Sequence, residues 1–291
     1  MGNARWSNVD WDRHAQATAP QSRSQIFTQG GMHADLDPAK IKFREAVDSP
    51  ANPASTPIIL AADETGSMGI LAETIIKTDL GIVMKELYDR KPVTDPQICC
   101  MATGDAYTDV APLQVTQFEA SIVLAEQLKN FYLEGNGGGN GGESYALAWA
   151  FAAYKTKCDA IRKRKRKGYL FTIGDEAPHL AITRDQLRTF FGMPAEADMN
   201  AKALLDHAQQ DWNIFHLIVK PVDNQPVVAK WRELLGERAI VVPNHENLAA
   251  GIVSVIQVIE GMDPLHVSKT WTGSDAVTAH EAVMQLTAGA V

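Results

Sequence analysis

The stretch from Ile58 to Ser67 constrains the fold of this chain more than any other. A short, unbroken apolar run, Ile58–Ala62, ends at Asp63, and hydroxyl residues follow at Thr65 and Ser67. An uninterrupted apolar run of this length is typical of a central parallel strand that is buried on both faces. An amphipathic helical pattern follows Ser67. The sequence therefore predicts a strand, then a polar loop, then the N-terminus of a helix. Such a junction is a common place for a protein to bind an ion or an anion.

Apolar strand-like runs alternate with amphipathic helical patterns along the rest of the chain. Strands are predicted at residues 58–62, 97–103, 168–175, 212–220 and 239–242, with an edge strand at 113–118. Helices are predicted around residues 76–87 and 118–132, after Glu143, after the capping box of Thr183 and Gln186, at 200–210, from Pro226 to Gly236, and at 248–259 behind an Asn244 cap. The alternation predicts an α/β fold with a doubly wound, mostly parallel central sheet and helices on both faces.

The two ends of the chain fall outside this alternation. Residues 1–55 are polar, and their aromatic residues Trp6, Trp11 and Phe27 stand alone. Such a segment cannot bury enough apolar surface to fold by itself, so we expect it to pack along the domain or onto another chain. Residues 263–291 are weakly patterned. We therefore predict a domain at 56–262 between two extended arms.

Composition narrows the class of protein. The chain has 291 residues with 45% hydrophobic and 21% charged residues, which is ordinary for a globular protein, and its formal net charge of -8 argues against nucleic acid as a principal partner. Its three cysteines, Cys99, Cys100 and Cys158, suit neither a disulfide framework nor a zinc site. We find no signal peptide and no apolar run long enough to span a membrane. We therefore expect a cytoplasmic protein with no membrane partner.

Oxygen-bearing side chains follow several of the predicted strands and also occupy a glycine-rich segment at residues 135–142. They are Asp63, Thr65, Ser67, Asp105, Asn140, Glu143, Asp175 and Glu176. The carboxyl ends of parallel strands meet at one edge of a sheet, so we expect these side chains to lie near one another. Carboxylate and hydroxyl oxygens are the ligands of hard cations such as magnesium, manganese and calcium.

The segment Asp63-Glu64-Thr65-Gly66-Ser67 resembles the Asp-x-Ser/Thr-x-Ser signature of the von Willebrand factor type A domain, where it forms the metal-ion-dependent adhesion site. In that family the aspartate usually acts through water, the two hydroxyls ligate magnesium directly, and a threonine and an aspartate on two further loops complete the shell. By its place in the chain, Asp175 matches the third-loop aspartate. Residues 139–144 are similar to a Gly-Gly-Asp-x-Pro-Glu variant of some bacterial and kinase-linked A domains, with Asn140 in place of aspartate. The resemblance covers residues 56–262 and leaves out both arms.

The resemblance implies a divalent cation, magnesium before manganese or calcium, and an intracellular prokaryotic or phage type of A domain. The implied metal ligands are Asp63, Thr65, Ser67, Asn140 and Asp175, with Asp105, Glu143 and Glu176 around them. A magnesium ion held mainly by neutral hydroxyls keeps enough electrophilicity to attract a carboxylate, so the implied function is capture of an acidic residue of a partner protein. In bacterial cells such partners are often AAA-type ATPases of the MoxR kind, chaperone-like assemblies or kinases.

Two other functions remain open. The chain could be an assembly protein of a phage or mobile element, with arms that contact neighbours and a virion location. It could also be a metal-dependent hydrolase that uses Asp63, Asp105 and Asp175, which would need a general base or nucleophile near the metal. The scattered histidines, including His179 and His216, do not indicate one, and we therefore expect a protein that is not an enzyme.

Simpler interpretations accompany the individual motifs. Thr65 or Ser67 could merely cap a helix, and Asp175 could be a turn residue. The glycine-rich segment lacks the lysine of a phosphate-binding loop. The basic run Arg162–Lys167 could touch nucleic acid, although in an acidic chain it is more typical of a solvated helix end.

Overall fold

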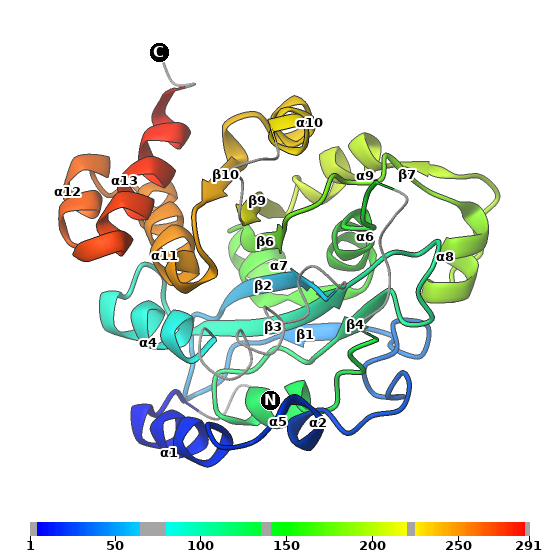
Figure 1. Ribbon diagram of the computed structural model, residues 1–291, viewed down its shortest axis with the longest axis horizontal. Helices are drawn as coiled ribbons and strands as arrows, with labels where there is room; N and C mark the ends of the chain where they lie inside the picture. Colours follow the sequence, from blue (N-terminus) through cyan, green and yellow to red (C-terminus); the bar gives the residue numbers. More distant parts are fainter. Residues whose placement is uncertain (1–4, 65–79, 135–140, 220–224, 289–291) are drawn as a thin grey trace.

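The computed structural model describes residues 5–64, 80–134, 141–219 and 225–288 (Figure 1). The predicted ligands Thr65, Ser67 and Asn140 therefore lie outside the described residues, as does the beginning of the helix that we expected after Ser67.

A six-stranded sheet forms the centre of the molecule, in the order β10-β9-β6-β2-β3-β4. The strands are β2 (Thr56–Asp63), β3 (Pro96–Thr103), β4 (Leu113–Val115), β6 (Gly168–Gly174), β9 (Trp212–Val219) and β10 (Ala239–Val242). Neighbours are parallel except for β4, which runs antiparallel to β3 at the edge. The predicted α/β class and the mostly parallel sheet are confirmed.

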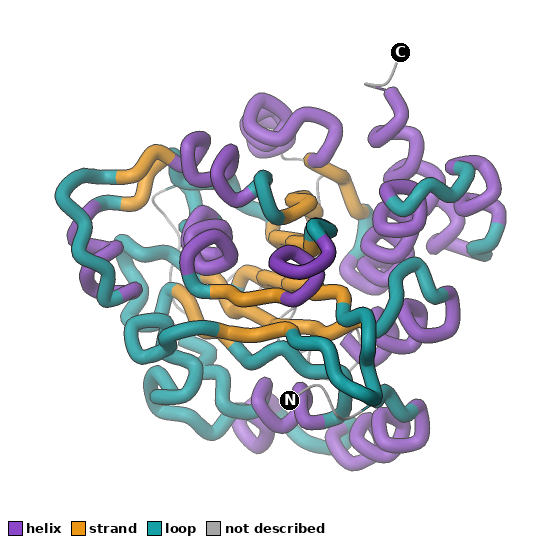
Figure 2. Tube along the Cα trace, turned by 180° about the vertical axis from the view of Figure 1, so that it is seen from behind, coloured by secondary structure: helices purple, strands orange, loops and turns teal. Residues whose placement is uncertain are grey.

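Side chains of the central strands alternate between two apolar layers. Ile58 and Leu60 of β2 face a layer with α4 (Leu80–Arg90), α5 (Val123–Leu128) and α11 (Leu248–Ile259). Ile59 and Ala61 face the opposite layer, which includes α6 (Ala146–Tyr154), α8 (Arg184–Phe191), α9 (Ala201–Ala208) and α10 (Gln225–Leu235). Figures 1 and 2 show these helices on the two sides of the sheet. Because successive side chains of a strand point to opposite faces, the sheet presents apolar surface on both sides, and helices cover each side. Burial of each aliphatic side chain stabilises this arrangement by about 1.5–3 kcal/mol.

Three boundaries differ from the sequence prediction. The edge strand ends at Val115, where the Val115 amide donates to the carbonyl of Leu36 in the N-terminal segment. Helix α5 covers Val123–Leu128 only, because Glu119 instead forms a bridge to Ile98 of β3. Asn244 caps a short 3-10 helix, His245–Asn247, that precedes α11. The capping box of Thr183 and Gln186 is present as predicted.

The N-terminal segment packs on its own domain. It contains α1 (Asn8–Thr18), α2 (Arg23–Ile26) and β1 (Arg44–Ala46), and β1 pairs with β5 (Thr156–Cys158). Trp6 stacks on Trp11 at 5.0 Å and on Tyr88 of α4 at 5.3 Å between ring centroids. Of the two possibilities left open by the sequence, the described residues show packing along the domain.

The described part of the C-terminal segment is helical, which corrects the expectation of an extended arm over 263–291. Helices α12 (Pro264–Lys269) and α13 (Gly273–Ala288) pack against α11. Asp263 caps α12, and Val267 and Trp271 are buried. The buried face of α13 consists of small side chains, Thr278, Ala279, Ala282 and Val283. Small apolar residues produce a weak periodic signal, which is why the sequence pattern missed this helix.

The basic run at the end of α7 (Asp159–Arg164) is engaged within the chain. Lys163 pairs with Asp159 at 2.7 Å, Arg164 pairs with Asp48, and Arg166 pairs with Glu260. These contacts favour the interpretation as a solvated helix end. Among the described residues, no helix combines the length and the apolar character needed to cross a membrane.

Candidate functional site

The loops at the carboxyl edge of the sheet bring together five of the predicted site residues. Asp63 ends β2, Asp105 follows β3, Asp175 and Glu176 follow β6, and Glu143 precedes α6. In the register of the sheet, Asp63 lies opposite Thr103, and the adjacent Ala62 lies opposite Ile173. Because these strands end at the same height in the sheet, the loops that follow them lie side by side.

Backbone hydrogen bonds join these loops directly. The Glu143 amide donates to the carbonyl of Ala177 at 2.8 Å, and the His179 amide donates to the carbonyl of Glu143 at 2.9 Å. On the other side, the Ser144 amide donates to the carbonyl of Gly104 at 3.2 Å. The segment around Glu143 is therefore held by backbone hydrogen bonds to both the loop after β3 and the loop after β6.

Asp63 is completely buried and held by a tyrosine. The hydroxyl of Tyr145, at the start of α6, donates to Oδ2 of Asp63 at 2.7 Å. Burial, together with the nearby Asp63 carboxylate, raises the pKa of Tyr145 well above its usual value, so the hydroxyl keeps its proton. A Cβ atom at Gly174 would lie 1.9 Å from this hydroxyl oxygen. Glycine at the end of β6 is therefore what allows Tyr145 to reach Asp63.

Asp105 is also buried and accepts several hydrogen bonds. The Tyr107 amide donates to its Oδ1 at 3.0 Å, and the Thr108 hydroxyl donates to its Oδ2 at 3.2 Å. Nε2 of His179 lies 3.1 Å from Oδ1, and the His179 ring packs edge-on against Tyr107. Sequence reasoning missed His179, since nothing in its neighbourhood links it to Asp105, which is 74 positions away.

Glu143 differs from both aspartates because no described residue donates a hydrogen bond to its carboxyl group. Its side chain is 1% exposed, and neither carboxyl oxygen has a hydrogen-bond partner among the described residues. Burial, followed by the nearby carboxylates of Asp63, Asp105, Asp109 and Glu176, raises the pKa of Glu143 to about 9. Without a cation nearby, this carboxyl is protonated at neutral pH.

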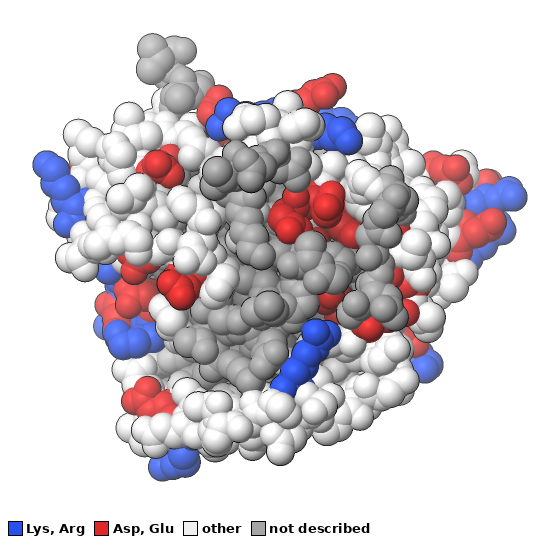
Figure 3. Space-filling view, viewed as in Figure 1, with Lys and Arg blue, Asp and Glu red and all other residues white. Residues whose placement is uncertain are grey.

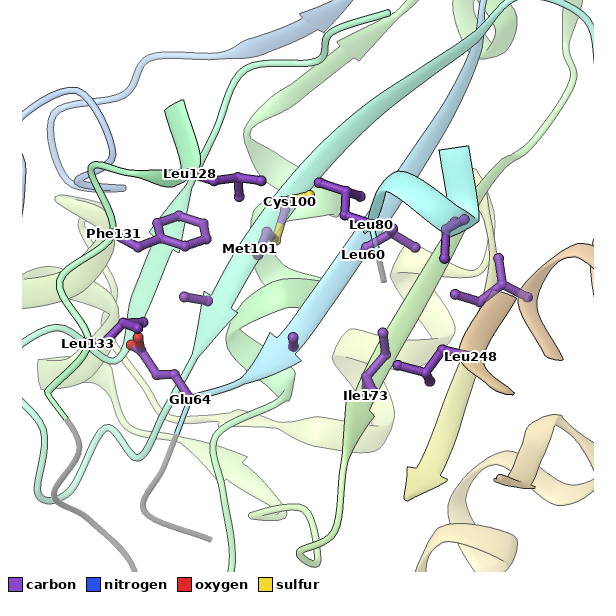
Figure 4. A pocket seen from close by; sticks show the side chains of 14 residues that line it. Leu60, Glu64, Leu80, Cys100, Met101, Leu128, Phe131, Leu133, Ile173 and Leu248 are labelled. Atoms are coloured by element: carbon purple, nitrogen blue, oxygen red, sulfur yellow. The ribbon is translucent and has the colours of Figure 1, made fainter. Parts of the chain in front are cut away.

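Glu64, the second residue of the motif, points away from this edge. Figure 4 shows its carboxyl group in an apolar cavity on the α4 and α11 side of the sheet, near Leu133 and on the same side as Ile173 and Leu248. The side-chain amide of Gln114 donates to its two oxygens at 3.1 and 3.3 Å. Burial raises the pKa of Glu64 well above its usual value.

An aromatic cluster supports the loop after β6. The indole N–H of Trp231 in α10 donates to the carbonyl of Glu176 at 2.9 Å, and its ring stacks on His216 with centroids 3.5 Å apart. Tyr145 packs edge-on against both rings. Burial lowers the pKa of His216 well below its usual value, so this histidine is a neutral core residue of β9.

The predicted metal ligands are only partly described. Within the described residues, no group of three or more His, Cys, Asp or Glu side chains is spaced to hold a metal ion by itself. Asp63 and Asp175 lie at the expected edge, and Thr65, Ser67 and Asn140 lie outside the described part of the chain. The oxygen chemistry of the edge and the unsatisfied carboxyl of Glu143 fit a hard cation. Figure 3 shows acidic side chains gathered beneath α10.

Comparisons with known proteins find similar backbones at low sequence identity. No family model matches this chain. No curated protein matches it either. The pilus adhesin SpaC from Lactobacillus rhamnosus GG in its open conformation has a TM-score of 0.48 and 8% identity, over 72% of this chain and 31% of the adhesin. A von Willebrand factor type A protein from Catenulispora acidiphila has a TM-score of 0.42 and 11% identity, over 81% of this chain and 52% of that protein.

A third similar structure is the conserved hypothetical protein BatB from Bacteroides thetaiotaomicron. Its TM-score is 0.39 with 12% identity, over 68% of this chain and 95% of BatB. This chain thus spans about a third of the adhesin and about half of the Catenulispora protein. Identities of this size concern the fold alone, and TM-scores below 0.5 do not assign the chain to a family.

Proposed function

We propose that this chain is a protein-binding module of the von Willebrand factor A type that captures an acidic residue of a partner through a divalent cation. One observation supports the cation above all others. Glu143 is a buried carboxyl group with no hydrogen-bond donor among the described residues, and its pKa is raised first by burial and then by four surrounding carboxylates. A buried carboxyl group in such a position needs a proton or a counter-ion, and a divalent cation would compensate several of these charges together.

The residues would have the metal-binding roles that the sequence resemblance implies. Asp63 and Asp175, with Thr65, Ser67 and Asn140, would hold the ion, and Asp105, Glu143 and Glu176 would surround it. Magnesium suits this all-oxygen set best, with manganese and calcium as alternatives. The bound ion would supply an electrophilic position for a carboxylate of the partner, while Tyr145 keeps Asp63 oriented through its hydrogen bond.

Binding is favoured over catalysis by the environment of His179. This residue and Asp105 form the kind of pair that a hydrolase uses as a general base. However, the imidazole ring packs closely against Gly142, because a Cβ atom there would lie only 3.1 Å from both Nδ1 and Cε1. The pair therefore serves to position the loop after β6, and we propose a module that is not an enzyme.

The packing of the chain ends and the state of the cysteines support a proposal for the cellular location and the partner. In the described residues both terminal segments pack on their own domain, which favours a self-contained module over a phage assembly protein held by its arms. Cys99, Cys100 and Cys158 are all free and buried, as is usual in a reducing compartment. We therefore propose the cytoplasm as its location and a MoxR-like AAA-type ATPase as the first candidate partner.

Calorimetry with magnesium and manganese tests the cation site. We expect binding to wild-type protein at neutral pH and its loss in Asp63→Ala and Ser67→Ala. The control is Asp89→Ala, which removes an exposed carboxylate that pairs with Lys85 on α4. A titration that is the same in wild type and in both site variants would refute the proposal.

The partner is tested by purifying tagged protein from its host with magnesium or with chelator. We expect one AAA-type ATPase to copurify only with magnesium, and to be lost from the Asp63→Ala protein.

A further inference from the structure

A groove lies beside the candidate site, between the start of α9 and the end of α10. We call it the α9–α10 groove. Its lining includes Pro178, Leu180, Asn200, Lys202, Lys230 and Leu234. The cation site as proposed accounts for none of these residues.

The groove is continuous with the loop that carries Asp175. Pro178 forms a β-bridge with Glu143, and it lies three positions after Asp175 in the chain. Three extended residues span at most about 10 Å. A peptide whose carboxylate was held at the site could therefore reach the groove with its next few residues.

The groove presents apolar surface that is otherwise exposed. The side chain of Leu180 is 66% exposed, and Leu234 of α10 is half-buried beside it. An aliphatic side chain placed between them would remove apolar area from water on both leucines. An exposed apolar patch with a polar rim is typical of a protein-binding surface.

The charges of the rim indicate what kind of segment fits. Lys202 pairs with Asp206 of its own helix. Lys230 is exposed and forms no ion pair with any described residue. Glu233 also lines the groove, and it disfavours an acidic group on its own side. Lys230, which has no ion-pair partner in the described part of the chain, is therefore the position for an acidic side chain of a ligand.

We propose that the α9–α10 groove binds the segment of the partner protein next to the carboxylate that the cation captures. The segment is extended, places an aliphatic side chain between Leu180 and Leu234, and places a second acidic side chain at Lys230. This inference rests on the proposed function, since the cation holds the first carboxylate. It adds a sequence preference of the form acid, aliphatic, acid within a few residues.

A library of short random peptides tests this preference. Peptides are selected on immobilised full-length protein in magnesium and, in parallel, in chelator. The expected result is enrichment, in magnesium only, of peptides with two acidic residues that flank an aliphatic residue. On Leu180→Ser protein the aliphatic preference disappears, and the best wild-type peptide binds roughly tenfold more weakly, because one leucine contact is lost. On Lys230→Glu protein the second acidic residue disappears from the selected peptides.

Two matched variants control for general surface effects. Arg232→Glu reverses an exposed charge on the same helix outside the groove, and Leu265→Ser removes an exposed leucine of α12. Both are expected to select the same peptides as wild type.

The groove assignment is overturned if Leu180→Ser and Lys230→Glu select the same peptides as wild type, or if magnesium enriches no peptide. Magnesium calorimetry on the same preparations separates the two ideas. Normal magnesium binding without a peptide preference refutes the groove alone, whereas absent magnesium binding refutes the cation site.

Discussion

Asp63 and Glu64 are consecutive carboxylic residues at the end of one strand, and they occupy opposite environments. Asp63 faces α6 and accepts a hydrogen bond from the hydroxyl of Tyr145, whereas Glu64 faces an apolar cavity and accepts one from the Gln114 amide. Both are buried. The alternation of a β-strand separates them, because successive side chains point to opposite faces of the sheet.

The comparison shows that burial alone does not mark a functional carboxyl group. Burial is the largest cause of the raised pKa of both Glu64 and Glu143. The neighbours differ, however, since no residue in the described part of the chain donates a hydrogen bond to Glu143, which lies among the carboxylates of the loop edge. A cation at that edge would act on Glu143 and leave Glu64 as a neutral, amide-bonded group.

The largest expected effect comes from adding one methyl group beneath Tyr145. Gly174→Ala would force its Cβ into the Tyr145 hydroxyl, and we expect it to lower the free energy of unfolding by about 3 kcal/mol. Urea denaturation measures this change. The control is Gly251→Ala in α11, where the new Cβ would lie 3.6 Å from Val242 and helix propensity would improve. Equal stability of the two variants would show that the Tyr145 hydroxyl does not require a glycine below it.

The second prediction concerns the pH dependence of stability without metal. Folding raises the pKa of Glu143 from 4.5 to about 9, so the folded state binds a proton that the unfolded state lacks between these values. The resulting stabilisation is complete below pH 4.5 and is lost as the pH rises toward about 9. We expect Glu143→Gln to flatten this slope and to stabilise the metal-free protein by about 2 kcal/mol in mildly alkaline solution. Denaturation in chelator over a pH series checks it.

The variant Glu64→Gln tests whether the carboxyl groups of Glu64 and Glu143 have different roles. The raised pKa of Glu64 gives a slope of the same sign, so this variant should also flatten the pH dependence. Only Glu143→Gln should weaken magnesium binding, because only Glu143 lies at the loop edge. If calorimetry gave both variants the same magnesium affinity, the two carboxyl groups would not have separate roles.

A smaller effect is expected when the Asp63 hydrogen bond is removed. Tyr145→Phe should cost about 1.5 kcal/mol in the free energy of unfolding and weaken magnesium binding. Tyr169→Phe loses a similar bond, to Glu260 at 2.6 Å, near the amino end of β6. This control should change stability but leave magnesium binding intact, as thermal denaturation with and without magnesium would show.

The smallest expected effect concerns magnesium binding by Glu64→Gln alone. Its magnesium-binding free energy should stay within about 0.5 kcal/mol of wild type, because substitutions away from a site usually change little. Calorimetry under the conditions used for the other variants provides the measurement. A larger loss would mean that the apolar cavity and the acidic edge are energetically coupled.

The sequence by itself determined the sheet and the edge at which the acidic residues meet. Apolar runs such as those in β2 and β6 are local signals, and parallel strands necessarily share a direction, so Asp63 and Asp175 could be placed at one edge without coordinates. The C-terminal helices were missed because the alanines of α13 produce little periodic contrast.

Only the tertiary structure decided what each acidic residue contacts. Tyr145 reaches Asp63 across 82 positions, His179 reaches Asp105 across 74, and Glu64 meets Gln114 across 50. Residue patterns report which side of a strand or helix is buried, but they contain no record of which distant side chain lies opposite. The hydrogen-bond partners of the acidic edge, and the lack of one for Glu143 within the described residues, therefore follow from packing across the sheet.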